Sequence, residues 1–161
     1  MRSAAFPVRV VKLAAGFRAH PELALVATGV AAATKCRMPA QVLIADDDPL
    51  LLDLLRHQLS SKGFDVLTAS DGATALELAE KHQPDVIILD ERMPKLSGFD
   101  VLRALRADPA LARIVVIMLT ARRRQEDVLA AFALGAHDYV AKPFKPEDLI
   151  GRIRRLALNV W

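Results

Sequence analysis

The sequence predicts an α/β fold in which five parallel strands form one doubly wound sheet. From Gln41 onward, short apolar runs alternate with amphipathic stretches, a rhythm that is typical of consecutive βα units. The apolar runs are rich in β-branched residues and mostly unbroken, as expected of strands that are buried on both faces. Right-handed crossovers between such strands place the helices on both sides of the sheet.

The expected elements follow one another in strict alternation. The strands are predicted at Val42–Ala45, Phe64–Thr68, Val86–Leu89, Ile114–Leu119 and Asp138–Ala141. A segment of helical period follows each strand, at Pro49–Ser60, Gly72–His82, Gly98–Arg106, Arg124–Leu134 and Pro146–Leu158. The apolar face of the first helix is predicted to contain Leu51, Leu54, Leu55 and Leu59.

Capping residues mark the ends of several predicted helices. Asp48 precedes Pro49, which places a capping carboxylate before a proline at the first helical position. Asp71 stands in the same place before the second helix. Gly63 and Gly135 follow helices at positions where a left-handed residue is favoured.

The first part of the chain does not follow this rhythm. Residues 1–38 are predicted to be a basic N-terminal extension and residues 39–161 the folded domain, with Met38 as a possible functional start. Residues 1–37 contain six Lys or Arg side chains and one acid, so they account for the net charge of +3. A signal peptide and a small helical segment that binds a partner are the alternatives for this extension.

Composition excludes several classes of protein. The longest apolar stretch, Leu23–Ala33, is far shorter than the roughly 20 residues that a membrane-spanning helix needs. Cys36 is the single cysteine, so no intrachain disulfide can form and a reducing compartment is expected. The domain beyond the extension carries a small negative net charge, which gives no electrostatic reason to expect nucleic-acid binding.

Side chains that could bind a ligand or take part in a reaction follow the predicted strands. They are Asp46, Asp47 and Asp48 after the first strand, Asp90 after the third, Thr120 after the fourth and Lys142 after the fifth. In an open parallel sheet, ligands bind beyond the carboxyl ends of the strands, where the strand order reverses. If the first and third strands are neighbours, Asp46, Asp47 and Asp90 converge there.

Converging carboxylates need a cation. Two carboxylates about 4 Å apart repel by roughly 4 kcal/mol at an effective dielectric constant of 20. Mg²⁺ suits a site of two or three carboxylates, a carbonyl oxygen and waters. Together with the ammonium of Lys142 and the hydroxyl of Thr120, such a site is suited to the negative charge of a phosphoryl group.

The four stretches VLIADDDP, DVIILDERMPKLSGFDVL, VVIMLTA and GAHDYVAKPF resemble the receiver domain of two-component response regulators. The resemblance covers residues 41–158, and the separations among Asp47, Asp90, Thr120 and Lys142 are similar to those of that family. It implies a flavodoxin-like (βα)5 sandwich with strand order 2-1-3-4-5, in the manner of stand-alone chemotaxis regulators.

The resemblance also implies roles for single residues. Asp90 is expected to accept the phosphoryl group, while Thr120 and Lys142 contact its oxygens. Asp47, Asp90 and the backbone carbonyl of Arg92 are expected to bind Mg²⁺ directly, with Asp46 holding a metal-bound water. Thr120 and Tyr139 are expected to form the conformational switch, and the Lys142–Pro143 bond is expected to be cis.

A cytoplasmic signalling protein follows from these roles. The expected partners are a histidine kinase or histidine phosphotransfer protein and a downstream target protein, with no direct contact to nucleic acid or membrane. The protein is not expected to be an enzyme beyond Mg²⁺-dependent self-phosphorylation and self-dephosphorylation. Because the chain ends directly after the fifth predicted helix, a stand-alone receiver is expected, with a fragment of a hybrid kinase or multidomain regulator as the alternative.

Two other classes of protein with a similar sheet or nucleophile fit the sequence less well. A phosphatase of the haloacid dehalogenase type needs a second aspartate two residues after its nucleophile, where this sequence has Arg92. A flavodoxin-like electron carrier needs a phosphate-binding loop of Ser, Thr and Gly after the first strand, and Asp46, Asp47 and Asp48 would repel the phosphate of the flavin there. Both are disfavoured.

Overall fold

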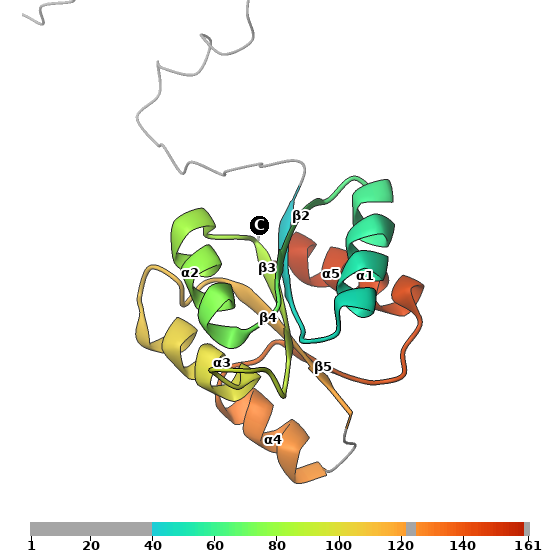
Figure 1. The fold of residues 1–161 in the computed structure, drawn as a ribbon. Helices are drawn as coiled ribbons and strands as arrows, with labels where there is room; N and C mark the ends of the chain where they lie inside the picture. The colour runs from blue at the N-terminus through green and yellow to red at the C-terminus, as the bar shows by residue number, and fades with distance from the viewer. Residues whose placement is uncertain (1–39, 122–124, 160–161) are drawn as a thin grey trace, which may run out of the picture. The chain divides into compact units, whose positions relative to one another are not determined.

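The structure, a computed structural model, describes residues 40–121 and 125–159. In this part of the chain, five parallel strands form one sheet in the order β2-β1-β3-β4-β5, and five helices flank it (Figure 1). The strands are β1 (Gln41–Ala45), β2 (Asp65–Ala69), β3 (Val86–Asp90), β4 (Val115–Thr120) and β5 (Asp138–Ala141). The helices are α1 (Pro49–Ser61), α2 (Gly72–His82), α3 (Gly98–Ala107), α4 (Gln125–Ala133) and α5 (Pro146–Asn159).

The predicted fold class and strand order are confirmed, and most element boundaries agree within one residue. The predictions for residues 1–38 and for a fourth helix beginning at Arg124 lie outside the described residues. Within residues 40–121 and 125–159, no helix combines the length and the apolar composition that crossing a bilayer requires.

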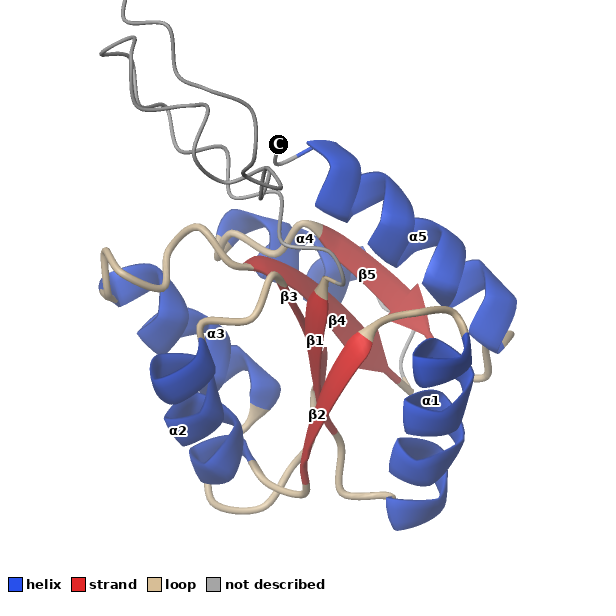
Figure 2. Cartoon of the chain, turned by 90° about the horizontal axis from the view of Figure 1, so that it is seen from above, coloured by secondary structure: helices blue, strands red, loops and turns tan. Residues whose placement is uncertain are grey.

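The helices form two layers, with α1 and α5 on one face of the sheet and α2, α3 and α4 on the other (Figure 2). Alternate residues of each central strand enter separate cores. Along β1, Leu43 packs with the α2, α3 and α4 side, whereas Val42 and Ile44 pack with the α1 and α5 side. Burial on both faces explains why the central strands read as unbroken apolar runs.

Two burial predictions are wrong. The strand β2 was expected to be buried on both faces, but Asp65 is exposed and most of the strand is only half-buried, because β2 lies at the edge of the sheet. On α1, Leu55 and Leu59 are buried as predicted, whereas Leu54 is 47% exposed. A single helical face cannot turn adjacent residues equally toward the sheet, since successive residues are rotated by about 100°.

The predicted caps are confirmed. The Asp48 carboxylate accepts hydrogen bonds from the backbone N–H groups of Leu50 and Leu51, at 2.9 and 3.3 Å. The Asp71 carboxylate caps α2 through the backbone N–H of Thr74. Gly63 and Gly135 have φ angles of 88° and 94°, in the left-handed region that glycine adopts without a steric penalty.

Gly98 lets α3 begin directly against the end of β3. A Cβ atom added to Gly98 would lie 2.2 Å from the backbone oxygen of Asp90, and a backbone atom cannot easily move away. We expect Gly98→Ala to lower the free energy of unfolding by roughly 1–3 kcal/mol, as other overpacked positions do.

Gly151 provides the matched control. It lies in α5, where an added Cβ would meet nothing within 4 Å, so Gly151→Ala is expected to raise the free energy of unfolding by roughly 0.5–1 kcal/mol. Urea denaturation of both variants measures the two effects. A stable Gly98→Ala protein would show that α3 can shift away from β3 at little cost.

Candidate functional site

The carboxyl ends of β1, β3 and β5 bring together three charged side chains from distant parts of the chain. The ammonium group of Lys142 lies 2.6 Å from Asp46 Oδ2 and 2.6 Å from Asp90 Oδ1. The Asp46 side chain is fully buried, that of Asp90 is 10% exposed and that of Lys142 is 24% exposed. The expected convergence of Asp46 and Asp90 is therefore present, whereas Asp47, which was expected beside them, is exposed and takes no part in these contacts.

A backbone N–H group donates a hydrogen bond to the second oxygen of each carboxylate. Asp46 Oδ1 accepts a hydrogen bond from the backbone N–H of Asp48, at 3.0 Å. Asp90 Oδ2 accepts one from the backbone N–H of Arg92, at 2.8 Å. Each carboxylate thus uses one oxygen for Lys142 and the other for the loop that follows its own strand.

Burial dominates the electrostatics of Asp46. Desolvation raises the pKa of the Asp46 carboxyl, and the neighbouring Asp90 adds to this effect, while the hydrogen bonds from Lys142 and Asp48 oppose it. Burial alone would lower the pKa of the Lys142 ammonium, but its contacts with Asp46 and Asp90 raise that pKa overall. Lys142 is therefore held in its charged form between the two carboxylates.

The raised pKa of Asp46 implies a cost to stability near neutral pH. A carboxyl with a higher pKa in the folded state binds its proton more tightly there, so its contribution favours folding at low pH and is lost as the pH rises. We expect Asp46→Asn, which removes the buried charge, to raise the free energy of unfolding at neutral pH. Its advantage over wild type should shrink near pH ~4, where the wild-type carboxyl becomes protonated. Urea denaturation at the two pH values measures this, and a variant that is less stable than wild type at neutral pH would contradict it.

An open pocket lies over these groups. Its lining consists of Asp47, Asp90, Glu91, Arg92, Ala121 and Lys142. Asp47 is exposed, unlike its neighbour Asp46, and Asp48 does not line the pocket because it caps α1. The three consecutive aspartates therefore have three different environments.

The donor chemistry of the pocket fits Mg²⁺. Two carboxylates, Asp47 and Asp90, line it together with Arg92, and oxygen ligands supplemented by water are what Mg²⁺ requires. The Lys142 ammonium, placed between Asp46 and Asp90, shows that a cation is accommodated beside these carboxylates. Among residues 40–121 and 125–159, no three acidic, histidine or cysteine side chains form a ready metal cage, so a backbone carbonyl and water would have to complete the site.

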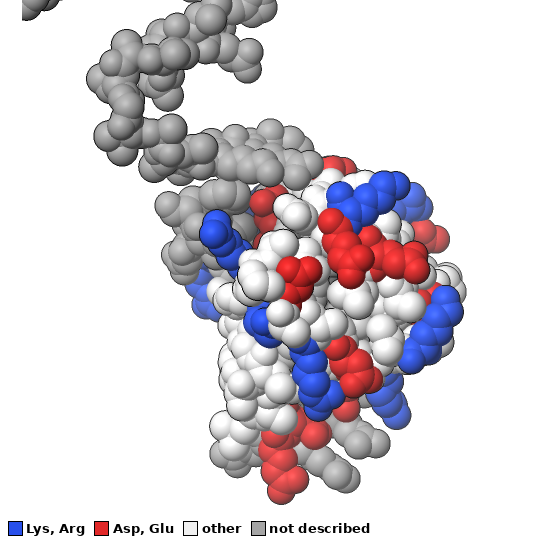
Figure 3. Space-filling view, turned by 90° about the vertical axis from the view of Figure 1, so that its left-hand side faces the viewer, with Lys and Arg blue, Asp and Glu red and all other residues white. Residues whose placement is uncertain are grey.

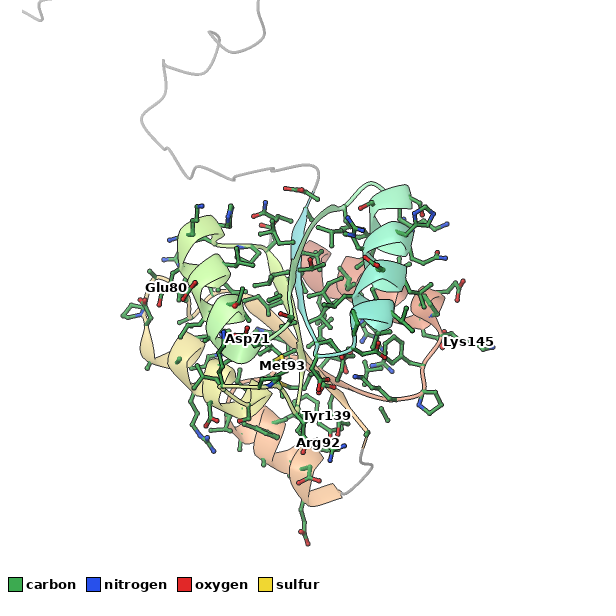
Figure 4. All side chains as sticks on the ribbon, in the orientation of Figure 1. Asp71, Glu80, Arg92, Met93, Tyr139 and Lys145 are labelled. Atoms are coloured by element: carbon green, nitrogen blue, oxygen red, sulfur yellow. The ribbon has the colours of Figure 1, made fainter. Side chains whose placement is uncertain are left out.

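Thr120 and Tyr139 lie at the same edge of the sheet, next to a carboxylate that the sequence analysis did not include. The hydroxyl of Thr120 donates a hydrogen bond to Glu91 Oε2, and the side chains of Thr120 and Tyr139 are also hydrogen-bonded. Tyr139 is half-buried against the core on the α2, α3 and α4 side, and Figure 4 shows it near the end of the sheet where Arg92 also lies. Burial raises the pKa of the Tyr139 hydroxyl, and the Glu91 charge contributes.

The strand register shows how Glu91 could have been found. Asp90 pairs with Leu119, so the residue after Asp90 must lie beside Thr120. The backbone N–H of Glu91 donates to the Leu119 carbonyl at 2.9 Å, which extends the β3–β4 pairing by one residue. Sequence reasoning passed over Glu91 because it stands between two residues with expected roles.

The loops on either side of the pocket are fixed by contacts of their own. The Lys142–Pro143 peptide bond is cis, and the backbone N–H of Lys142 donates to the Thr120 carbonyl at 2.6 Å. In the β3–α3 loop, Lys95 has a φ of 66°, and its ammonium pairs with Asp71 at 3.0 Å. Asp71, labelled in Figure 4, thus joins the start of α2 to the loop that follows Asp90.

Comparison with known proteins identifies the domain. The sequence profile of the response regulator receiver domain matches residues 42–154. The chain belongs to the response regulator receiver family. It is therefore a receiver domain of the kind found in two-component signalling.

Solved receivers have the same fold. The superposition on the Francisella response regulator 1452 receiver domain covers 76% of this chain and 99% of that chain, with a TM-score of 0.72 and 33% identity. Against the chemotaxis regulator CheY4 of Vibrio cholerae, the TM-score is 0.69 at 36% identity, over 73% of this chain and 98% of that chain.

Curated relatives include larger regulators. The chain is 42% identical over 123 residues to the DNA-binding response regulator MtrA of Mycolicibacterium smegmatis, covering 76% of this chain and 53% of MtrA. It is 44% identical over 116 residues to the DNA-binding dual master transcriptional regulator RpaA of Synechocystis, covering 72% of this chain and 48% of RpaA. The chain spans about half the length of these relatives.

These relatives overturn one prediction. The expectation of no direct contact with nucleic acid is wrong, because it was argued from the charge of the folded domain, whereas MtrA and RpaA are DNA-binding regulators. The net charge of a receiver domain does not indicate whether the regulator that contains it binds DNA. On the face drawn in Figure 3, acidic and basic side chains are indeed interspersed, as is common for the surface of a soluble domain.

Proposed function

We propose that this receiver accepts a phosphoryl group on Asp90 from the phosphohistidine of a histidine kinase or a histidine phosphotransfer protein. The observation that carries the proposal is the arrangement of Lys142 between Asp46 and Asp90 at the floor of an open pocket. Of the two carboxylates, Asp90 is partly exposed, whereas Asp46 is fully buried. An incoming phosphorus atom can therefore reach Asp90.

The chemistry is nucleophilic substitution at phosphorus. A carboxylate oxygen of Asp90 forms the new P–O bond while the P–N bond of the phosphohistidine breaks, and the histidine leaves with the electron pair of that bond. Lys142 moves its hydrogen bond from the carboxylate to the phosphoryl oxygens, and Thr120 donates its hydroxyl to them. Lys142 lines the pocket before the reaction, whereas Thr120 has to exchange its hydrogen bond to Glu91 for one to a phosphoryl oxygen.

Mg²⁺ is the cofactor that we propose for this step. Asp47, Asp90 and the backbone carbonyl of Arg92 would hold it, with Asp46 contributing through a water molecule. When bound, the ion neutralises part of the negative charge that collects on the transferring phosphoryl group. The reaction is a self-phosphorylation followed by self-dephosphorylation, and we propose no further enzymatic activity.

The output is proposed to pass through α4, β5 and α5. Thr120 links the pocket to Tyr139 on β5, so recruitment of Thr120 by the phosphoryl group changes the contacts of Tyr139. Leu129 and Phe132 on α4 are 62% and 46% exposed, which gives this surface an apolar patch suited to a partner. Two arrangements of Thr120 and Tyr139 would thus bias one docking surface.

The proposal is tested by incubating the protein with acetyl phosphate and Mg²⁺ and measuring its intact mass. We expect one phosphate adduct on wild type, loss of the adduct in the presence of EDTA, and no adduct on Asp90→Asn. The absence of an adduct on wild type, or an equal adduct on both proteins, would overturn the proposal. An equal adduct with and without EDTA would overturn the role of Mg²⁺ alone.

The names of the relatives point the output toward control of transcription. MtrA, RpaA and the transcriptional regulatory protein PhoP of Bacillus subtilis are 39–44% identical to this chain over 116–123 residues. We infer that phosphorylation of Asp90 controls binding to DNA here too. Gel retardation with genomic fragments tests this inference. We expect the protein to slow the migration of a DNA fragment only when acetyl phosphate and Asp90 are both present. The same DNA mobility under all conditions would contradict the inference.

A further inference from the structure

We propose that Glu91 is a positioning residue that holds Thr120 and Tyr139 in the unphosphorylated arrangement and competes with the phosphoryl group for the Thr120 hydroxyl. This inference deepens the proposed function and depends on it. It assigns a role to the one acidic side chain of the pocket lining that the proposed phosphoryl transfer does not use.

The backbone of Glu91 is fixed on both sides. Its N–H donates to the Leu119 carbonyl at 2.9 Å, and its carbonyl accepts from the N–H of Gly98 at 3.0 Å. Gly98 opens α3 in close contact with the backbone of Asp90, so the segment from Asp90 to Glu91 has little freedom. The half-buried side chain of Glu91 is thereby directed at the end of β4, where it accepts the Thr120 hydroxyl.

Thr120 takes part in two side-chain hydrogen bonds, one with Glu91 and one with Tyr139. A threonine hydroxyl has one proton to donate, and in this structure Thr120 donates it to Glu91. The Thr120 side chain is also hydrogen-bonded to that of Tyr139. Thr120 thus connects the ring on β5 to Glu91, the residue that follows Asp90.

The same proton is required by the phosphoryl group. When Asp90 is phosphorylated, Thr120 can donate to a phosphoryl oxygen only after it has left Glu91. The Glu91 carboxylate then lies beside an added dianion in the same pocket, and like charges at short range disfavour each other. Glu91 thus stabilises the resting arrangement directly and opposes the phosphorylated one.

The consequence is a measurable shift in affinity for a phosphoryl analogue. Beryllofluoride with Mg²⁺ mimics a phosphoryl group on a carboxylate and binds reversibly, so it reports the balance between the two arrangements. We expect Glu91→Ala to lower its dissociation constant by roughly tenfold, which corresponds to about 1.4 kcal/mol. Glu91→Gln should have a smaller effect in the same direction, because a neutral amide oxygen still accepts a hydrogen bond, only more weakly.

The single tyrosine of the chain provides a second readout. With tyrosine labelled at the carbon that bears the hydroxyl, the NMR spectrum contains one signal, that of Tyr139. In Glu91→Ala without beryllofluoride, this signal should move toward its position in the beryllofluoride-bound wild type. Glu80→Gln is the matched control, since it removes one acidic charge from an exposed position on α2, labelled in Figure 4.

The outcomes separate the two proposals. If wild type binds beryllofluoride and both Glu91 variants match Glu80→Gln in affinity and in the Tyr139 signal, the role of Glu91 is overturned and the proposed function stands. A lower affinity of the Glu91 variants would also overturn it, since Glu91 would then assist phosphorylation. If wild type itself fails to bind beryllofluoride with Mg²⁺, the proposed function is overturned and the role of Glu91 with it.

Discussion

Asp47→Asn is expected to lower the rate of phosphorylation by acetyl phosphate by more than about a hundredfold. Asp47 lines the pocket together with Asp90, and we propose that both bind Mg²⁺ directly. Loss of a residue that only supports a metal ligand costs about 10- to 100-fold in metal affinity, so loss of a ligand should cost more. Intact mass spectrometry over a time course measures the rate.

The adjacent aspartate is the control for this prediction. Asp48 caps α1 and does not line the pocket, and asparagine is also a good helix cap. Asp48→Asn should therefore be phosphorylated at nearly the wild-type rate with nearly unchanged stability. Equal loss of phosphorylation in the two variants would show that the acidic run acts through its total charge and not through a position in a metal site.

Lys142→Met is expected to destabilise the protein at neutral pH by about 3–5 kcal/mol, the usual cost of removing one partner of a buried ion pair. The variant would leave Asp46 and Asp90 without the ammonium that lies 2.6 Å from each. Because the hydrogen bond from Lys142 lowers the pKa of Asp46, its loss raises that pKa further. The deficit should consequently shrink as the pH falls and the carboxyl becomes protonated.

Lys145→Met controls for the loss of a positive charge from the same segment of chain. Lys145 is exposed and lies just before α5 (Figure 4), where substitutions usually change the free energy of unfolding by less than about 0.5 kcal/mol. Urea denaturation of both variants across the pH range gives the comparison. A Lys142→Met protein that is as stable as Lys145→Met at neutral pH would contradict the assigned role of Lys142 as the cation of the resting site.

Several features of the site lower the stability of the fold. Desolvation raises the pKa of Asp46, and Gly98 allows a backbone approach that no other residue permits. Local choices that weaken a domain without a packing benefit are typical of functional sites. The three consecutive aspartates illustrate the distinction, because Asp48 stabilises a helix while Asp46 opposes folding near neutral pH.

Much of the fold could be predicted because strands buried on both faces leave an unmistakable pattern. The convergence of Asp46 and Asp90 followed from strand order alone, since the carboxyl ends of parallel strands share an edge. The partial exposure of β2 was missed although the expected strand order already places this strand at the edge of the sheet, where one side has no neighbouring strand. Leu54 was assigned to the buried face of α1 because its identity is apolar, although its position points elsewhere.

The contacts of Glu91 and Lys142 were the less predictable part of the site. Both are ionised side chains whose partners depend on the register between strands, and a one-residue change in register would separate Glu91 from Thr120. The sequence indicated which residues reach the pocket. It did not indicate that Lys142 bridges both carboxylates in the resting protein, nor that the Thr120 hydroxyl is already engaged.

The central claim, that Asp90 receives the phosphoryl group, is tested most directly by locating the modification. Borohydride reduces an aspartyl phosphate to homoserine, so peptide mass mapping after treatment with acetyl phosphate and Mg²⁺ identifies the modified residue. We predict homoserine at position 90 and at no other aspartate. Homoserine at Asp46 or Asp47, or a phosphate adduct that yields no homoserine, would contradict this account of the site.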